Sequence, residues 1–102
     1  MVYRKLFPSV LQARAGEGYT VYAYMNDGTV RLFDASPWLT NPQGVFKRIA
    51  APETFSECLT VMNGTVAWDI GGNMDATNCI DIDPYTVYES PIVEDPLLSV
   101  AD

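Results

Sequence analysis

The stretch YTVYAYMNDGTVRLFDA, residues 19–35, predicts a β-hairpin. Its first part, residues 19–25, is rich in the β-branched and aromatic side chains that favour strands. Gly28 ends an Asn-Asp-Gly turn, because glycine takes the positive φ that a tight hairpin requires. Residues 29–35 form the returning strand, and the partial alternation of residues 9–15 predicts a further strand before the hairpin.

A second hairpin is predicted for LTVMNGTVAW, residues 59–68. Two apolar strands flank Asn63-Gly64, a dipeptide that strongly favours a two-residue type I′ turn. We therefore assign Asn63 and Gly64 a structural role in this turn. Trp68 ends the hairpin, and we expect its large apolar side chain to lie in the core.

Prolines divide the segment between the two hairpins into short helical turns. Ser36-Pro37 has the residue types of an N-cap and a first helical position, and Pro52 starts another turn. We expect an α+β fold, in which a small antiparallel sheet built from two hairpins carries short helical turns on one face. Residues 1–90 would form this single domain, and residues 91–102 an extended C-terminal tail.

The stretch CIDIDPYTVY, residues 79–88, contains two aspartates with different expected roles. Asp83 directly precedes Pro84, so its carboxylate is placed to accept backbone N–H groups of a helical turn. The alternation of apolar and acidic residues puts Asp81 on an exposed face, where a partner could reach it. We expect Tyr88 to pack back under the sheet.

Charge is unevenly distributed along the chain, whose net charge is −7. Residues 1–50 hold all six basic residues and three acidic ones, a net +3, whereas residues 51–102 hold ten acidic residues and no basic ones, a net −10. This asymmetry favours a basic protein partner. It argues against direct nucleic-acid binding, which needs a basic patch to neutralise phosphates. The alternative interpretation is that the acidic residues only keep the protein soluble.

Residues that carry catalytic or metal chemistry are sparse. The chain has no histidine, and Cys58 and Cys79 form no Cys-x-x-Cys pair. The usual base near neutral pH and the usual zinc ligands are therefore missing. The aspartates after Trp68 do not have the spacing of a calcium-binding EF-hand loop. We predict that the protein is not an enzyme and has no catalytic residue, metal or cofactor.

Membrane and export signals are also missing from the pattern. No apolar run approaches the roughly 20 residues that a membrane-spanning helix needs. The basic residues near the start precede no apolar stretch long enough for a signal peptide, and two cysteines are too few for a disulfide scaffold. We expect a reduced, cytoplasmic protein without membrane contact.

Four aromatic residues form a further candidate binding surface. Tyr22 and Tyr24 fall on the same face of the strongest predicted strand. If the helical turns leave that face uncovered, Tyr22, Tyr24, Trp38 and Tyr85 would form an aromatic patch suited to a partner. Alternatively, one hairpin packs over these side chains, and the sequence leaves both interpretations open.

Three segments in their order and spacing resemble a small bacterial family known as domain of unknown function 2442. They are YTVYAYMNDGTVRLFDASPWL (residues 19–39), GVFKRIAAPETFSECLTVMNGTVAW (residues 44–68) and CIDIDPYTVYE (residues 79–89), within a match that covers residues 9–90. The chain departs from the family pattern in its longer loop at residues 69–78 and in its tail after Ser90. The resemblance implies a compact α+β domain, similar to partners encoded beside small putative toxins, and it implies no activity.

These observations favour a non-enzymatic acidic protein that binds and regulates a basic partner protein, as an antitoxin or another inhibitor does. The first alternative is a nucleic-acid mimic that blocks a DNA-binding protein, and the second is a sheet module that binds a small ligand or peptide. A homo-oligomer could also form through an unpaired edge strand. The residues predicted to contact a partner are Asp69, Asp75, Asp81, Glu89, Glu94, Asp95, Tyr22, Tyr24, Trp38 and Tyr85.

Overall fold

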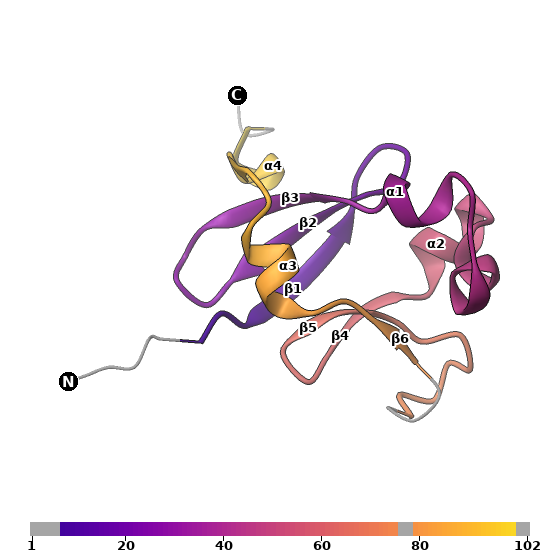
Figure 1. Ribbon diagram of the computed structural model, residues 1–102. Helices are drawn as coiled ribbons and strands as arrows, with labels where there is room; N and C mark the ends of the chain where they lie inside the picture. The colour runs from indigo at the N-terminus through magenta and orange to yellow at the C-terminus, as the bar shows by residue number, and fades with distance from the viewer. Residues whose placement is uncertain (1–6, 76–78, 100–102) are drawn as a thin grey trace.

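Two small antiparallel sheets and several short helices make up the protein (Figure 1). The computed structural model describes residues 7–75 and 79–99. The predicted α+β class is confirmed. Within the described residues, no helix has the length and apolar composition of a membrane span.

The first sheet contains the hairpin predicted for residues 19–35. Its strands are β1 (Val10–Ala15), β2 (Thr20–Met25), β3 (Val30–Asp34) and β7 (Ile92–Val93), in the spatial order β1-β2-β3-β7. All neighbouring strands pair antiparallel. Gly28 has a φ of 89° in the turn between β2 and β3, which glycine adopts without steric strain.

The second sheet contains the other predicted hairpin. Its strands are β4 (Leu59–Met62), β5 (Thr65–Trp68) and β6 (Ile80–Asp81), with β5 in the middle. Asn63 and Gly64 have φ values of 54° and 76°, and a type I′ turn requires positive φ at both positions. Every residue of β5 is buried, so this strand runs through the centre of the molecule.

The strands divide between two sheets, whereas the sequence analysis places both hairpins in one. The sheets meet where β1 reaches the turn of the second hairpin, and the Val10 N–H donates to the Gly64 carbonyl at 2.8 Å. β1 and β4 are in contact there without forming a paired ladder. The alternation of a hairpin fixes its own register, but it does not specify which other strand its edge will join.

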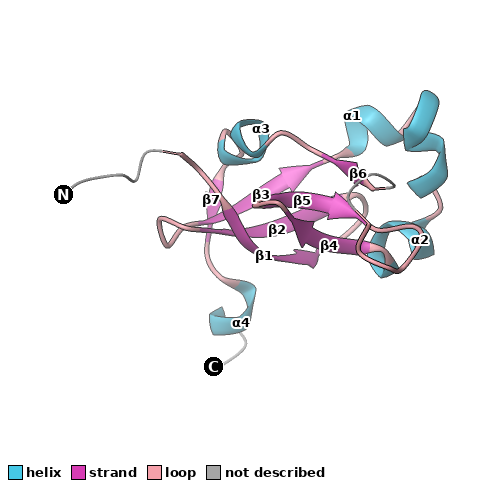
Figure 2. Ribbon diagram, turned by 90° about the horizontal axis from the view of Figure 1, so that it is seen from below, coloured by secondary structure: helices cyan, strands magenta, loops and turns pink. Residues whose placement is uncertain are grey.

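Short helices connect and cover the strands (Figure 2). They are α1 (Ser36–Leu39), the 3₁₀-helix η1 (Gly44–Ile49), α2 (Pro52–Glu57), α3 (Pro84–Tyr88) and α4 (Pro96–Ser99). Proline is the first residue of α2, α3 and α4, because its fixed φ and missing N–H suit that position. Asp83 caps α3, since its carboxylate accepts the N–H of Tyr85 at 2.9 Å.

The core lies between the two sheets and is built around Trp68 and Phe55, which are 0% and 1% exposed. Their ring centroids are 5.3 Å apart, and the ring of Tyr19 meets Phe55 edge-on at 5.2 Å. The Trp68 indole N–H donates to the Phe55 carbonyl at 3.0 Å. This bond supplies the partner that a buried indole nitrogen needs.

The chain after α3 folds onto the first sheet instead of extending from it as the predicted tail at residues 91–102. β7 pairs with β3, and α3 and α4 lie on opposite sides of the sheet (Figures 1 and 2). Asp95 accepts the Leu97 N–H at 2.9 Å and the Tyr24 hydroxyl at 2.8 Å, so it fixes the start of α4 to β2. A two-residue strand has no periodicity, but Asp95-Pro96 carries the same capping signal as Asp83-Pro84.

Candidate functional site

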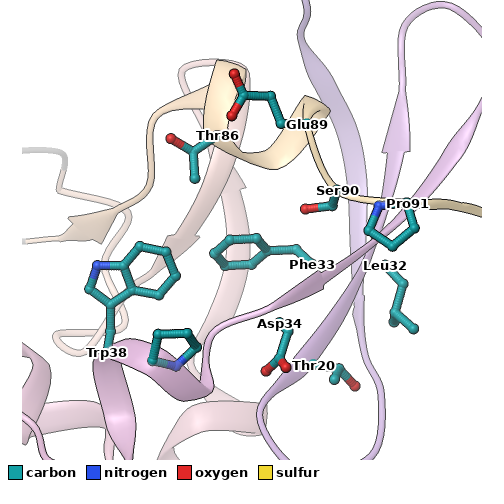
Figure 3. Close-up of a pocket in the computed structure, with 10 residues that line it drawn as sticks. Thr20, Leu32, Phe33, Asp34, Trp38, Thr86, Glu89, Ser90 and Pro91 are labelled. Carbon is teal, nitrogen blue, oxygen red and sulfur yellow. The ribbon is translucent and has the colours of Figure 1, made fainter.

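A cleft of ≈470 Å³ opens at the edge of the first sheet, between α1 and α3 (Figure 3). Its volume falls within the range of roughly 300–1,000 Å³ that is typical of ligand pockets. β3 forms its floor, α1 one wall, and the end of α3 the other wall. The lining residues are Thr20, Leu32, Phe33, Asp34, Pro37, Trp38, Thr86, Glu89, Ser90 and Pro91.

The cleft begins where β7 stops pairing with β3. The Leu32 N–H donates to the Pro91 carbonyl at 3.0 Å, but Pro91 has no N–H with which to return a bond to β3. Before Pro91 the chain belongs to the end of α3, where the Ser90 N–H donates to Val87. The edge of β3 beside Asp34 is therefore left open to the cleft.

Aromatic rings form the apolar part of the cleft. Phe33 and Trp38 project into the space between α1 and α3 (Figure 3), with their ring centroids 5.5 Å apart. Trp38 is half-buried and also packs against Phe46 at 6.5 Å. Because rings on two sides hold the indole, it keeps its orientation without a ligand.

Asp34 carries a negative charge at the end of β3, where its side chain lies on the sheet face opposite Phe33 and beside Thr20 (Figure 3). Its Oδ1 accepts the backbone N–H of Ser36 at 2.9 Å and also the Ser36 hydroxyl. These bonds, the hydroxyl bond first, hold the pKa of the Asp34 carboxyl below its ordinary value. Asp34 is therefore ionised at neutral pH, and none of the described residues donates to its Oδ2.

Glu89, at the C-cap of α3, is the second carboxylate among the lining residues, and its side chain points away from Phe33 and Trp38 (Figure 3). Its side chain is exposed, and no donor in residues 7–75 or 79–99 reaches it. The hydroxyls of Thr86 and Ser90 line the same wall. The lining contains no described Lys or Arg, so it combines two carboxylates, three hydroxyls and two aromatic rings without a cation among the described residues.

A neighbouring cluster, which we call the Arg31 anchor, holds α3 against β3. The Arg31 guanidinium donates to the carbonyls of Tyr88 and Ser90 at 2.8 and 3.1 Å, and it lies 4.1 Å from the centroid of the Tyr88 ring. A cation beside the last carbonyls of a helix is also stabilised by the helix dipole. The anchor thus fixes the wall of the cleft that carries Ser90.

Asp27 completes the Arg31 anchor from the turn between β2 and β3. Its carboxylate accepts the Tyr88 hydroxyl at 2.9 Å, and the N–H and hydroxyl of Thr29 at 2.9 and 2.6 Å. The Thr29 hydroxyl is the main reason why the pKa of Asp27 is lowered, and the bond to Asp27 is the main reason why the pKa of Tyr88 is raised. Tyr88 therefore belongs to the architecture, as the sequence analysis expects.

Asp69, predicted to face a partner, is buried with 8% of its surface exposed. Its two carboxylate oxygens accept the N–H groups of Gly72 at 3.1 Å and Met74 at 2.7 Å. The carboxylate therefore shapes the loop after β5 and is not presented to a partner. An aspartate at the start of a glycine-containing turn is the residue type that makes such local bonds.

Four of the other acids predicted to contact a partner lie in two separate regions. Asp75 and Asp81 are exposed near Cys79, whose thiol pKa is raised first by burial and then by Asp69 and these two carboxylates. Glu94 is exposed beside β7, whereas Asp95 is half-buried and bonded to Tyr24. Of the six predicted acids, Glu89 alone lines the cleft.

The four aromatic residues do not gather into one patch. Tyr22 and Tyr24 are half-buried on the sheet face opposite Phe33, and the hydroxyl of Tyr24 is bonded to Asp95. Trp38 packs on Phe33 instead, on the other side of the sheet. Tyr85 is 49% exposed on α3 and does not line the cleft. Strand alternation explains this separation, since Phe33 and the two tyrosines project from opposite faces of the same sheet.

The remaining chemistry of the described residues is limited. Cys58 and Cys79 are free thiols. No group of three or more Cys, Asp or Glu side chains in residues 7–75 and 79–99 is arranged to hold a metal ion. Among the described residues, the cleft is therefore the candidate binding site.

Comparisons with known proteins give no match: no family model, no curated protein and no solved structure corresponds to this chain. The resemblance to domain of unknown function 2442 accordingly stays a prediction from the quoted segments. Of the lining residues, Trp38 and Glu89 are among those that the sequence analysis predicts to contact a partner, and Asp34 and Phe33 are not. The spacing Asp34-x-Ser36, which is that of an Asx turn, was a usable signal for Asp34.

Proposed function

We propose that this is a non-enzymatic interaction protein that binds and regulates a basic partner protein, as an antitoxin or another inhibitor does. The observation that carries this proposal is the cleft, whose lining contains the carboxylates of Asp34 and Glu89 and, among the described residues, no cation. Carboxylate oxygens that accept no hydrogen bond, such as Asp34 Oδ2 and those of Glu89, gain most from a partner that brings positive charge.

Charge outside the cleft supports association with such a partner. The exposed acids Asp81 and Glu94 add to the negative field of the base-free half. Fields of this kind raise association rates by roughly 10–10³-fold and are screened by salt. The cleft would supply the specific contact, and the surrounding acids would supply the steering.

Several features support binding over catalysis. The chain has no histidine, and burial raises the pKa of the Cys79 thiol, which disfavours the nucleophilic thiolate. The resemblance to domain of unknown function 2442 implies no activity either. Two free cysteines are compatible with the reducing cytoplasm, and we place the protein there as part of the same proposal.

The proposal is tested by comparing which proteins are retained from an extract of the source cells. The cleft variant carries Asp34→Asn with Glu89→Gln, in which the new amide at position 34 keeps the oxygen that accepts from Ser36. Its matched control carries Glu53→Gln with Glu57→Gln, which removes the same charge from exposed positions of α2. We expect wild type and control to retain the same basic protein, and the cleft variant to lose it.

Salt elution and DNA competition complete this experiment. The retained protein should elute as salt is raised from about 50 to about 500 mM, a range over which the screening length falls from roughly 14 to 4 Å. Equal retention by the wild type and the cleft variant would contradict the proposal. If added DNA displaces the partner, the protein acts as a nucleic-acid mimic instead.

A further inference from the structure

We infer that the cleft receives an extended segment of the partner, which adds to the open edge of β3 as a short further strand in line with β7. The inference rests on the proposed function and specifies which part of a basic partner the cleft takes. The segment would carry an apolar side chain next to a basic one. The backbone groups of β3, the lining of the cleft on both faces of the sheet and the charge of Asp34 each support it.

Alternate residues of β3 direct their backbone groups away from β2. The Ala35 N–H donates to the Tyr19 carbonyl at 2.8 Å, and β2 and β3 pair without a shift in register. Because residues of an antiparallel pair alternate between facing the partner strand and facing away from it, Leu32 and Asp34 present their N–H and C=O groups to the opposite edge. The bond from the Leu32 N–H to the Pro91 carbonyl, at 3.0 Å, lies on that edge.

β7 covers only the first part of this edge. It pairs with Val30 and Arg31, and Pro91 has no N–H with which to bond the Leu32 carbonyl. Within residues 7–75 and 79–99, no donor reaches the Leu32 carbonyl and no acceptor reaches the Asp34 N–H. Free backbone groups at the edge of a sheet are a template for another strand. The pairing of β7 itself extends over two residues, so an added strand of that length matches this edge.

The cleft surrounds the free edge from both faces of the sheet. Phe33 and Trp38 lie on one face, whereas Asp34 shares the other face with Leu32 and Thr20 (Figure 3). An extended segment that runs beside β3 would place its successive side chains on the two faces in turn. The lining therefore favours an added strand over a compact ligand that contacts one face.

The two faces favour different side chains. The residue of the segment opposite Phe33 would lie against Phe33 and Trp38, and an apolar side chain suits these rings. The residue opposite Asp34 would share the face of its carboxylate, which is exposed and whose Oδ2 accepts from none of the described residues. An opposite charge directly across two strands is favourable. The cleft thus fits an extended segment in which apolar and basic residues alternate.

The Asp34 N–H would bond the segment whichever way the segment runs. In an antiparallel segment, the basic residue opposite Asp34 would exchange bonds with both its N–H and its carbonyl. In a parallel segment, the apolar residue opposite Phe33 would donate to the Leu32 carbonyl and accept from the Asp34 N–H. The direction of the segment therefore decides whether its basic or its apolar residue donates to β3.

The first experiment titrates acetyl-Lys-Val-Lys-Val-Lys-amide, which we call the Lys-Val peptide, into the isotope-labelled protein. Nuclear magnetic resonance would follow the amide of Asp34 and the indole N–H of Trp38. A peptide of this size binds with a dissociation constant on the order of 1 mM. We expect binding to shift both signals and to slow the hydrogen exchange of the Asp34 amide.

Two methylated forms of the Lys-Val peptide serve as matched controls. One carries N-methyl groups on its valines and the other on its lysines, so each keeps every side chain and the net charge. Successive N–H groups of a strand point to opposite edges, and only one set can donate to β3. We expect one methylated form to bind roughly three- to tenfold more weakly, because it loses a hydrogen bond, and the other to bind like the parent peptide.

A pair of protein variants tests the same bond from the other side. Asp34→Pro and Asp34→Ala both remove the carboxylate, but only proline also removes the N–H. Proline is tolerated at an edge position whose N–H bonds no neighbouring strand, and a dispersed spectrum would verify that the variant folds. We expect Asp34→Pro to bind the Lys-Val peptide roughly three- to tenfold more weakly than Asp34→Ala. If the proline variant does not fold, the methylated peptides decide with the wild-type protein.

Equal binding of the parent and both methylated peptides would overturn the inference, and so would shifts that lie outside the cleft. If the Lys-Val peptide fails to bind while the basic protein from the extract is still lost in the cleft variant, the proposed function stands and the added strand alone is wrong. If the peptide binds as expected but no basic protein is retained, the strand site stands and the proposed function is wrong.

Discussion

The Arg31 anchor and the cleft lie on either side of Ser90. Both contain oxygen acceptors and an aromatic ring, but they differ in whether a cation is present. In the anchor, one guanidinium satisfies two carbonyls and covers a tyrosine ring, and Asp27 takes the tyrosine hydroxyl. The cleft is lined by two carboxylates and a tryptophan ring, and none of the described Lys or Arg residues lines it. The cation of the anchor thus comes from the chain itself, whereas the described residues bring no cation to the cleft.

Because of this difference, we expect the anchor to contribute to stability and the cleft to contribute to binding. A satisfied polar cluster holds elements in place, because removing one member leaves partly buried groups without partners. Acceptors that face solvent contribute little to folding, but they are ready to bind a donor without rearrangement. We therefore expect substitutions in the anchor to change the free energy of unfolding, and substitutions in the cleft to change affinity.

The largest effect on stability is expected for Arg31→Met, which keeps the apolar stem and removes the guanidinium. The carbonyls of Tyr88 and Ser90 would lose their donor, and hydrogen bonds to charged groups are worth about 1.5–3 kcal/mol. We expect the free energy of unfolding to fall by about 2–3 kcal/mol in urea denaturation.

The matched control for this loss is Arg14→Met, at an exposed position of β1. It removes the same group and should change the free energy of unfolding by no more than about 0.5 kcal/mol. If the two substitutions have equal effects, the Arg31 anchor does not hold α3.

A smaller effect is expected in acid, where both regions lose a carboxylate charge. The pKa of Asp27 is lowered in the folded protein by Thr29 and then by Tyr88. Its contribution to stability is therefore complete above the ordinary carboxyl pKa of about 4, and it is lost as the pH falls below that value. We expect the free energy of unfolding, measured between about pH 6 and about pH 2.5, to fall less in Asp27→Asn than in wild type, by under about 1 kcal/mol because the site is solvated.

The pKa of Asp34 is also lowered, through Ser36, but its charge serves the cleft. Cation binding should accordingly persist to about pH 4 and weaken below it. If the free energy of unfolding falls by the same amount in acid for Asp27→Asn and wild type, the role of Asp27 in the anchor is contradicted.

Local signals in the sequence predict the hairpins and caps well. Asn63-Gly64 specifies its turn because few other residues tolerate positive φ at both positions, and Asp83-Pro84 specifies a helix start. Tyr88 and Trp68 also lie where their patterns place them. These features depend on neighbours within a few residues, so a single sequence contains the information.

The cleft depends on contacts that are distant in the sequence and was therefore only partly predicted. It exists because β7 pairs with β3, from the far end of the chain, and because Pro91 ends that pairing beside Asp34. The sequence around Arg31 predicts only a strand residue, although its guanidinium donates to the Tyr88 carbonyl at the end of α3. Asp69 was predicted to be exposed to a partner, but its carboxylate accepts backbone N–H groups of the following loop. A sequence pattern does not show such bonds.

The central claim is that the cleft, and not the general acidity of the protein, binds the basic group. The most direct measurement is the affinity for the Lys-Val peptide of three proteins: wild type, the cleft variant Asp34→Asn with Glu89→Gln, and the α2 control Glu53→Gln with Glu57→Gln. Both variants change the net charge equally. We predict the same dissociation constant for wild type and control, and one at least about tenfold higher for the cleft variant, which corresponds to about 1.4 kcal/mol. Equal weakening of both variants would show that only net charge matters and would contradict the account.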